Sequence, residues 1–278
     1  MKLKYLGTAA AEGIPAVFCE CETCKKSRLA GGRNIRTRSQ AIVNDDLLID
    51  FPADTYMHSL LHNIDLCKVK SCIVTHSHMD HLYPADTEVR KDGFAHIYSS
   101  NDPLVFYSDE ASRIKLMEAI DYWEIPESTI QSKLIKVFET FETQGYKVTA
   151  LRAAHDPKSD PVVFIIEKQG KTIFYSNDTS EYPEESMEYL SKLDKPLDLI
   201  SLDCTEGASH TTYVGHLNLW RCIDLRKKLI EMGAADEHTV FVLNHFSHNG
   251  SDVMYDDFVK LAAEHNFLVS YDGMEIEI

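Results

Sequence analysis

The stretch CIVTHSHMDH, residues 72–81, places three histidines and an aspartate within six positions, directly behind a short apolar run. The β-branched residues before His76 are typical of a buried strand, and because side chains alternate in an extended segment, His76 and His78 are expected to point the same way. The chain must then turn to present Asp80 and His81 together. Neutral imidazole and carboxylate groups are the usual ligands of zinc and similar ions. We therefore predict a metal site at a strand end, with a solvated histidine-rich loop as the alternative.

The composition indicates a folded, acidic protein. The 278 residues are 44% hydrophobic and 26% charged, which is ordinary for a soluble globular chain with a substantial core. The 28 Lys and Arg stand against 44 Asp and Glu, so the formal net charge is −16. Since phosphate backbones are bound by basic surfaces, nucleic acid is an unfavourable partner. The N-terminal MKLKYLGTAA lacks the apolar run of a signal peptide and no run is long enough to span a bilayer, which predicts a cytoplasmic protein without membrane contact.

Strand-like runs and helical patterns alternate along the whole chain. Helical patterns follow Pro52, Pro103 and Pro183, and two more cover about 216–231 and 252–264. Many strands with helices distributed between them predict an α/β (α+β) fold, in which helices cover sheets, rather than an all-β sandwich.

The domain organisation is expected to be simple. No Gly/Ser-rich or Pro-rich linker divides the chain, so we expect a single domain over residues 1–278. The stretch at about 84–131 comes directly after the histidine cluster and carries a mostly helical pattern. We predict that it forms an insertion or lid beside the site.

Further ligands are needed, because a metal held by two histidines still requires a third protein group and an open position for chemistry. Three residues follow strand-like runs in the same way as the first cluster: His155 after VTALRAA, Asp178 after TIFYSN and His245 after TVFVLN. Taken alone, each is more often a hydrogen-bonded structural group or a helix cap. Their common context, together with the HxHxDH motif, predicts that they complete the metal site.

Cysteines suggest a second metal site. The chain has seven, an odd number, and Cys19, Cys21 and Cys24 stand together in CECETC. In a reducing compartment such a cluster suits metal binding better than a disulfide framework. A tetrahedral zinc takes four N or S ligands, so three cysteines leave one vacancy. From these residues alone, an incidental cluster remains the alternative.

The HxHxDH motif, a later histidine, the aspartate of SNDT and the histidine of LNHFSH together resemble the metallo-β-lactamase superfamily over nearly the whole chain. The resemblance implies a four-layer αβ/βα sandwich with two metal ions at the sheet edges. The implied ligands of one ion are His76, His78 and His155. The implied ligands of the other are Asp80, His81 and His245, with Asp178 bridging both.

Other segments are similar to the phosphoribosyl 1,2-cyclic phosphate phosphodiesterases, a branch associated with the carbon-phosphorus lyase pathway whose core also resembles tRNase Z. They are GTAAAEGIPAVFCECETC, SLDCTEG with the following GHLN, NHFSHN and YDGMEIEI. This likeness implies a structural zinc held by Cys19, Cys21, Cys24 and His248. It implies that His216 gives a proton to the leaving group, with Asp80 as a candidate to assist. The likeness is weak over about 84–150.

These residues predict a hydrolase with two divalent cations, Zn²⁺ or Mn²⁺, and one structural Zn²⁺. Two cations about 3.5 Å apart can clamp the attacking and leaving oxygens of an in-line displacement and supply hydroxide near neutral pH. The expected substrate is a small phosphodiester, above all a cyclic sugar phosphate, attacked at phosphorus by metal-bound hydroxide. The sequence has no GxSxG elbow that would indicate a serine nucleophile.

Several alternatives stay open. A tRNase Z-like endoribonuclease shares the core, although the acidic composition and the lack of a basic arm count against it. A lactonase or thioesterase of the same superfamily would use the same metals, and a metal-dependent sensing protein without turnover is the non-enzymatic alternative. The ligand set admits zinc, manganese or iron. The oligomeric state is open, with a homodimer as one option.

Overall fold

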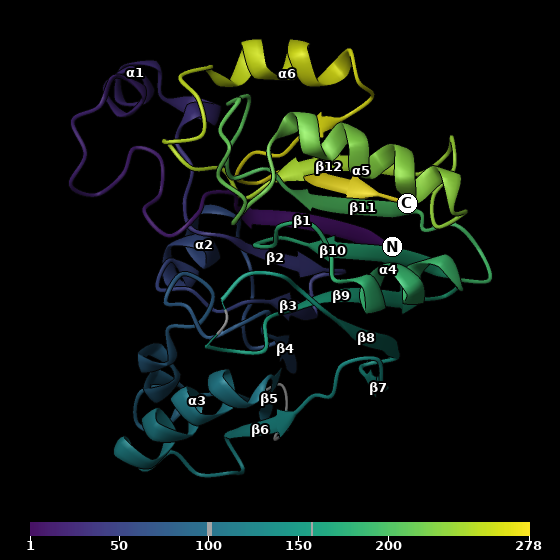
Figure 1. The fold of residues 1–278 in the computed structure, drawn as a ribbon. Helices are drawn as coiled ribbons and strands as arrows, with labels where there is room; N and C mark the ends of the chain where they lie inside the picture. Colours follow the sequence, from purple (N-terminus) through teal and green to yellow (C-terminus); the bar gives the residue numbers. More distant parts are fainter. Residues whose placement is uncertain (99–101, 157) are drawn as a thin grey trace.

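Two mixed seven-stranded sheets lie face to face at the centre of the protein (Figure 1). The computed structural model describes residues 1–98, 102–156 and 158–278. The first sheet, in spatial order, consists of β14 (Glu275–Glu277), β1 (Lys2–Gly7), β2 (Gln40–Val43), β3 (Leu47–Ile49), β4 (Ser71–Ile73), β5 (Leu104–Ser108) and β6 (Ile130–Leu134). The second consists of β13 (Leu268–Val269), β12 (Val240–Asn244), β11 (Leu199–Asp203), β10 (Lys171–Ser176), β9 (Val162–Lys168), β8 (Tyr146–Arg152) and β7 (Thr140–Thr143).

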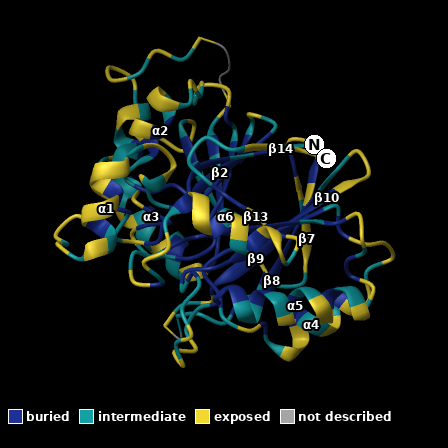
Figure 2. Ribbon diagram, turned by 90° about the horizontal axis from the view of Figure 1, so that it is seen from above, coloured by how far each residue is buried: buried dark blue, intermediate teal, exposed yellow. Residues whose placement is uncertain are grey.

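Helices cover the outer faces of both sheets, which makes four layers. They are α2 (Thr55–Leu61), α3 (Glu110–Tyr122), α4 (Glu184–Ser191), α5 (Leu219–Glu231) and α6 (Tyr255–Ala263), with the 3₁₀ segment η2 (Pro84–Arg90). Helix α1 (Glu22–Ala30) lies apart from the sheets and contacts the 3₁₀ segment η1 (Gly32–Asn34) (Figure 1). Buried residues concentrate in the central strands, while the outward sides of the helices are exposed (Figure 2). Within the described parts of the chain, no helix is both long and apolar enough to cross a membrane. The predicted α+β sandwich is confirmed.

The alternation of side chains along each strand separates the inner core from the outer ones. In β2, Ala41 and Val43 join the core between the sheets, whereas Ile42 joins the core under the helices of the first sheet. In β10, Tyr175 faces the inner core and Phe174 faces the opposite side. Because both faces of these strands are covered, apolar or aromatic residues follow one another without alternation in their centres, AIV in β2 and IFY in β10.

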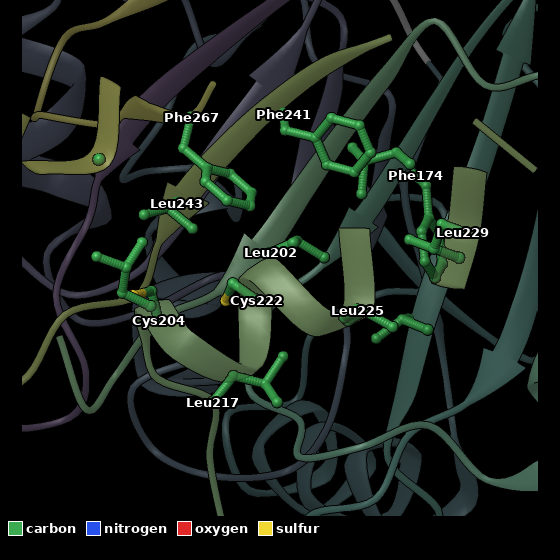
Figure 3. Close-up of a cluster of buried hydrophobic side chains, with 14 of the residues drawn as sticks. Phe174, Leu202, Cys204, Leu217, Cys222, Leu225, Leu229, Phe241, Leu243 and Phe267 are labelled. Carbon is green, nitrogen blue, oxygen red and sulfur yellow. The ribbon is translucent and has the colours of Figure 1, made fainter. Parts of the chain in front are cut away.

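Helix α5 shows how the outer layer is attached to the second sheet. Its fully or nearly buried residues recur at helical spacing and form one apolar stripe. Figure 3 shows this stripe packed on Phe174, Leu202 and Phe241 of the sheet. The members of the stripe are Leu219, Cys222, Leu225 and Leu229.

The segment 84–131 is less helical than predicted. Pro103 does not start a helix, because the strand β5 follows it and pairs in parallel with both β4 and β6. Helix α3 begins only after Asp109, whose side chain accepts hydrogen bonds from the backbone N–H groups of Ala111 and Ser112. The apolar and aromatic run LVFYS favours a strand buried on both faces. The segment therefore extends the first sheet as well as adding helices to it (Figure 1).

Candidate metal centre

The candidate centre lies where strand ends from both sheets meet. Strands β10, β11 and β12 run parallel, and β8 runs in the same direction because two antiparallel steps separate it from β10. Their carboxyl ends therefore face one edge of the second sheet. His155 follows β8, Asp178 follows β10 and His245 follows β12 at this edge. The first sheet contributes the loop after β4.

This loop, residues 75–82 and called the histidine loop below, is not extended. Strand β4 ends at Ile73, earlier than predicted, and bends and turns follow it. The backbone N–H groups of His81 and Leu82 both donate to the carbonyl oxygen of His78, at 3.1 and 2.8 Å. A turn, and not the alternation of side chains in a strand, therefore brings these histidines together.

The first ligand group surrounds one side of the Asp178 carboxylate. Its Oδ2 lies 3.2 Å from Nε2 of His76, and its Oδ1 lies 3.3 Å from Nε2 of His155. Nδ1 of His78 is 3.2 Å from the same His155 nitrogen. The four ligand atoms lie within 4.8 Å of one another, close enough to hold one cation.

The second ligand group shares the same carboxylate. Nε2 of His81 lies 3.1 Å from Oδ2 of Asp178 and 3.2 Å from Oδ2 of Asp80. Nε2 of His245 is 3.3 Å from Nε2 of His81. These four ligand atoms again fall within 4.8 Å of one another. The structure thus brings all seven residues named from the sequence into two groups that meet at Asp178.

The donor set fits divalent cations. Nε2 of His76 and Oδ1 of Asp178 are buried and have no hydrogen-bond partner within residues 1–98, 102–156 and 158–278. Such orphaned polar atoms are rare in folded proteins, because leaving them unsatisfied is costly. Their lone pairs converge with those of neighbouring imidazoles, as ligand atoms do around an ion. The chemistry and placement of these groups therefore fit a two-cation site.

Asp50, which the sequence analysis missed, orients the second group. Its Oδ2 accepts a hydrogen bond from Nδ1 of His81 at 2.7 Å, while its Oδ1 accepts from the backbone N–H and the hydroxyl of Thr75. The bond to Nδ1 leaves Nε2 of His81 as the ligand nitrogen. Asp50 follows DLLI, so the context of an acid after a strand, already used for Asp178, could have identified it.

Asp203 has the matching role in the second sheet and was also missed. Its Oδ2 accepts from the hydroxyl of Thr205 at 3.0 Å, and Nδ1 of His245 lies 2.8 Å from that hydroxyl. The same carboxylate lies 3.2 Å from Nδ1 of His216. Asp203 could itself group with Asp178, His216 and His245 around an ion. Its oxygens already accept several hydrogen bonds, including those from the backbone N–H groups of Asp178 and Leu217, so we assign it an orienting role.

Three of these residues have left-handed backbone conformations. Asp50, Asp178 and His245 have φ values of 65°, 56° and 64°. Residues other than glycine seldom adopt this region, and the strain tends to persist at functional sites where the surroundings enforce it. In each case the chain turns sharply just after a strand, which places the side chain at the sheet edge.

Burial and charge act in opposite directions on the titrating groups. Burial lowers the pKa of His155 to about 4, which keeps its ring neutral and able to bind a cation. Burial disfavours the anion of Asp178, but the neighbouring His245 and His76 outweigh it and hold the pKa of that carboxyl well below its usual range. Burial also disfavours protonation of His216, yet the charge and hydrogen bond of Asp203 raise its pKa to about 9.

The cysteine cluster forms a separate candidate site. Nδ1 of His248 lies 3.4 Å from Sγ of Cys21 and 3.6 Å from Sγ of Cys19, and Cys24 completes the group. The backbone N–H of Cys24 donates to Sγ of Cys21, and this bond lowers the pKa of the thiol to about 6. The backbone N–H of Ala16 donates to Sγ of Cys24. Three sulfurs and one imidazole nitrogen match the ligand set of structural zinc.

A family model described as the beta-lactamase superfamily domain matches residues 47–245. The chain belongs to this superfamily. The fold is that of its metallo-β-lactamase members, and membership supports hydrolysis that depends on divalent metal ions. None of the curated proteins shows a significant sequence match.

Solved structures of several metallo-β-lactamase-fold proteins are similar over the whole chain. A diphosphatase of the PhnP family is 21% identical, with a TM-score of 0.76 and coverage of 100% of this chain and 97% of that one. The metallo-β-lactamase fold protein YhfI from Bacillus subtilis is 16% identical, with a TM-score of 0.71 and coverage of 100% and 99%. Human tRNase Z, short form, is 16% identical, with a TM-score of 0.65 and coverage of 100% and 99%. At these identities the likeness shows the fold.

Replacing Asp50 by Asn should weaken metal binding without unfolding the protein. The amide nitrogen cannot accept a hydrogen bond, so either His81 or Thr75 loses its partner. Loss of such an orienting carboxylate typically costs about 10- to 100-fold in metal affinity. Competition with a chelator measures the change, and Asp45→Asn, at an exposed carboxylate that pairs with Lys2, is the control. Equal affinity in both variants would contradict the role of Asp50.

Replacing Cys21 by Ser should release one metal ion per chain and lower the melting temperature, because structural zinc contributes directly to folding. Turnover per folded molecule should fall much less. Elemental analysis and thermal unfolding measure the two effects, and Cys67→Ser, at an exposed cysteine outside the cluster, is the matched control. Unchanged metal content in Cys21→Ser would reject the site.

Proposed function

We propose that the chain is a dinuclear metal-dependent phosphodiesterase acting on small substrates, cyclic sugar phosphates in particular. The observation that carries this proposal is the position of His216. Its Nδ1 lies 3.3 Å from Oδ1 of Asp178, the residue shared by both ligand groups, and 3.2 Å from Oδ2 of Asp203. A histidine paired with a carboxylate therefore stands directly beside the two-cation site.

The chain would hold one cation through His76, His78 and His155. It would hold the other through Asp80, His81 and His245, with Asp178 common to both. Cations bound there would offset the charge of the phosphodiester and lower the pKa of water so that it can attack phosphorus. Most of the ligands are buried, while His78 and His155 are partly exposed and face the side from which a substrate can reach the centre.

His216 would supply the proton that the leaving oxygen needs. Hydrolysis forms one P–O bond from water and breaks the P–O bond to the sugar, whose oxygen leaves as an alkoxide unless it is protonated. The bond from Nδ1 to Asp203 leaves Nε2 as the nitrogen that donates. Asp203 also favours the protonated ring, which is the form required of a general acid. With His216 as the proton donor, Asp80, the candidate to assist this transfer, would serve as a metal ligand only.

The space beside the cluster supports a small substrate. A cavity of about 460 Å³ is bounded by the ligand His155 and by Gly215, the residue before His216. This volume lies in the range of small-molecule pockets, roughly 300–1,000 Å³. Its wall carries two acids, Asp156 and Asp160, and one base, Arg152, which pairs with Asp160. Such a wall disfavours a long polyanion and supports the choice of a small diester over RNA.

Replacing His78 or Asp178 by Ala should abolish phosphodiester hydrolysis, because each change removes a ligand and not a core apolar group. A panel of 1,2-cyclic and 2′,3′-cyclic phosphates, a nucleoside diphosphate, a lactone, a thioester and pre-tRNA measures the activity. His238→Ala, at an exposed histidine, is the control. Cleavage of pre-tRNA with cyclic phosphates untouched would favour the nuclease, and full activity in both ligand variants would reject the site.

Replacing His216 by Ala should slow diesters with alkoxide leaving groups about 10²- to 10⁴-fold, the usual contribution of a general acid. Diesters of p-nitrophenol should lose far less, because phenolate departs without a proton. His210→Ala removes an exposed histidine of the same loop, which stacks on Trp220 away from the cluster, and is the control. Equal losses on both substrate types would remove His216 from the proton transfer.

A further inference from the structure

Lys115 of helix α3 bonds the histidine loop at two points, one before the turn and one at the end of the loop. Its ammonium donates one hydrogen bond to the carbonyl oxygen of Ser77 and another to that of Leu82, each at 2.7 Å. These carbonyls bracket the ligand residues His78, Asp80 and His81. The side chain is half-buried, so these bonds are shielded from the full competition of water.

Helix α3 is itself held firmly in place. Its first turn is capped by Asp109, and Leu116 and Ile120 are buried in the core under the first sheet. Leu82, at the end of the histidine loop, belongs to the same core cluster. Lys115 therefore projects from a fixed helix onto a loop end that the helix also helps to bury.

We propose that Lys115 is a positioning residue, which clamps the histidine loop in the conformation that presents Asp80 and His81 to the metal centre. Inside the loop, the amides of His81 and Leu82 donate to a single acceptor, the carbonyl of His78, and the backbone N–H of Phe51 donates to the carbonyl of His81. The two bonds from Lys115 close the same loop from outside, between residues five positions apart. This gives the segment 84–131 a function that its sequence did not reveal.

A lysine suits this position chemically. An ammonium has three donors and no acceptor, so it can satisfy two carbonyl oxygens at once, and bonds from a charged donor are stronger than neutral ones. Burial lowers the pKa of Lys115, while the charge of Asp80 opposes that shift and favours the ammonium. An apolar residue here would leave two carbonyls without these partners.

The test compares Lys115→Met with Lys91→Met. Lys91 lies in the same segment and also donates to a backbone carbonyl, that of Trp123 at the end of α3, but does not bond the histidine loop. In metal-free protein, the amides of His81 and Leu82 should lose protection from hydrogen exchange in Lys115→Met and keep it in Lys91→Met. Zn²⁺ affinity at the histidine centre should fall about 10- to 100-fold in Lys115→Met alone, as for the loss of other groups that orient ligands.

The cysteine site serves as an internal reference, because its Zn²⁺ affinity should stay unchanged in both variants. If Lys115→Met does not fold, Lys115→Gln, which keeps a donor for one carbonyl, should show the same two losses in smaller measure. Wild-type exchange and affinity in the folded variant would overturn the clamp, as would equal losses in Lys91→Met.

The expected loss of Zn²⁺ affinity rests on the proposed metal centre, whereas the hold of Lys115 on the loop rests only on its two hydrogen bonds. Exchange in the metal-free protein therefore separates the two proposals. A loop that loosens in Lys115→Met, in a protein whose histidine centre binds no Zn²⁺ even as wild type, would uphold the clamp and reject the proposed function.

Discussion

The carboxylate of Asp178 is buried between imidazoles drawn from both sheets, and the rest of the site depends on this arrangement. Its oxygens lie 3.2 Å from His76, 3.1 Å from His81 and 3.3 Å from His155. An ionised carboxylate in such a place is tolerated only if a protonated imidazole or a bound cation compensates its charge. The two sheets must therefore stay packed at a spacing that keeps the histidine loop opposite the end of β10. The inner core of close-packed side chains from both sheets sets that spacing.

Each sheet adds a buried acid that fixes the histidines. Asp50 at the end of β3 holds His81, and Asp203 at the end of β11 holds His216 directly and His245 through Thr205. Both acids also accept backbone N–H groups, so their own positions are determined by the chain. The two sheets thus orient their histidines in the same way. Nδ1 of His81 bonds Asp50 and Nδ1 of His245 bonds Thr205, while Nε2 of each ring faces the centre.

The loop after β12 connects the metal centre with the cysteine cluster. His245 belongs to the metal centre and His248 to the cysteine cluster, so one short loop connects the two sites. Ser247 between them donates to the carboxylate of Glu12, whose Oε1 is also 3.6 Å from Nε2 of His248. The N-terminal segment is thereby attached to the loop after β12, as α3 is attached to the histidine loop through Lys115.

The sequence by itself determined the residue types of the site and the class of fold. HxHxDH and the residues after three strand-like runs identified the candidate ligands, because metal binding requires particular side chains at strand ends. Short strand-like runs distributed between helical patterns predicted sheets covered by helices. Tertiary structure decided what local patterns do not encode. It set the meeting of the histidine loop with the strand ends of the second sheet, the strand after Pro103, and the partnerships of Asp50, Asp203 and Lys115. These depend on contacts between residues distant in the chain, and a buried aspartate or a half-buried lysine is distinguished from a surface one only by the elements packed around it.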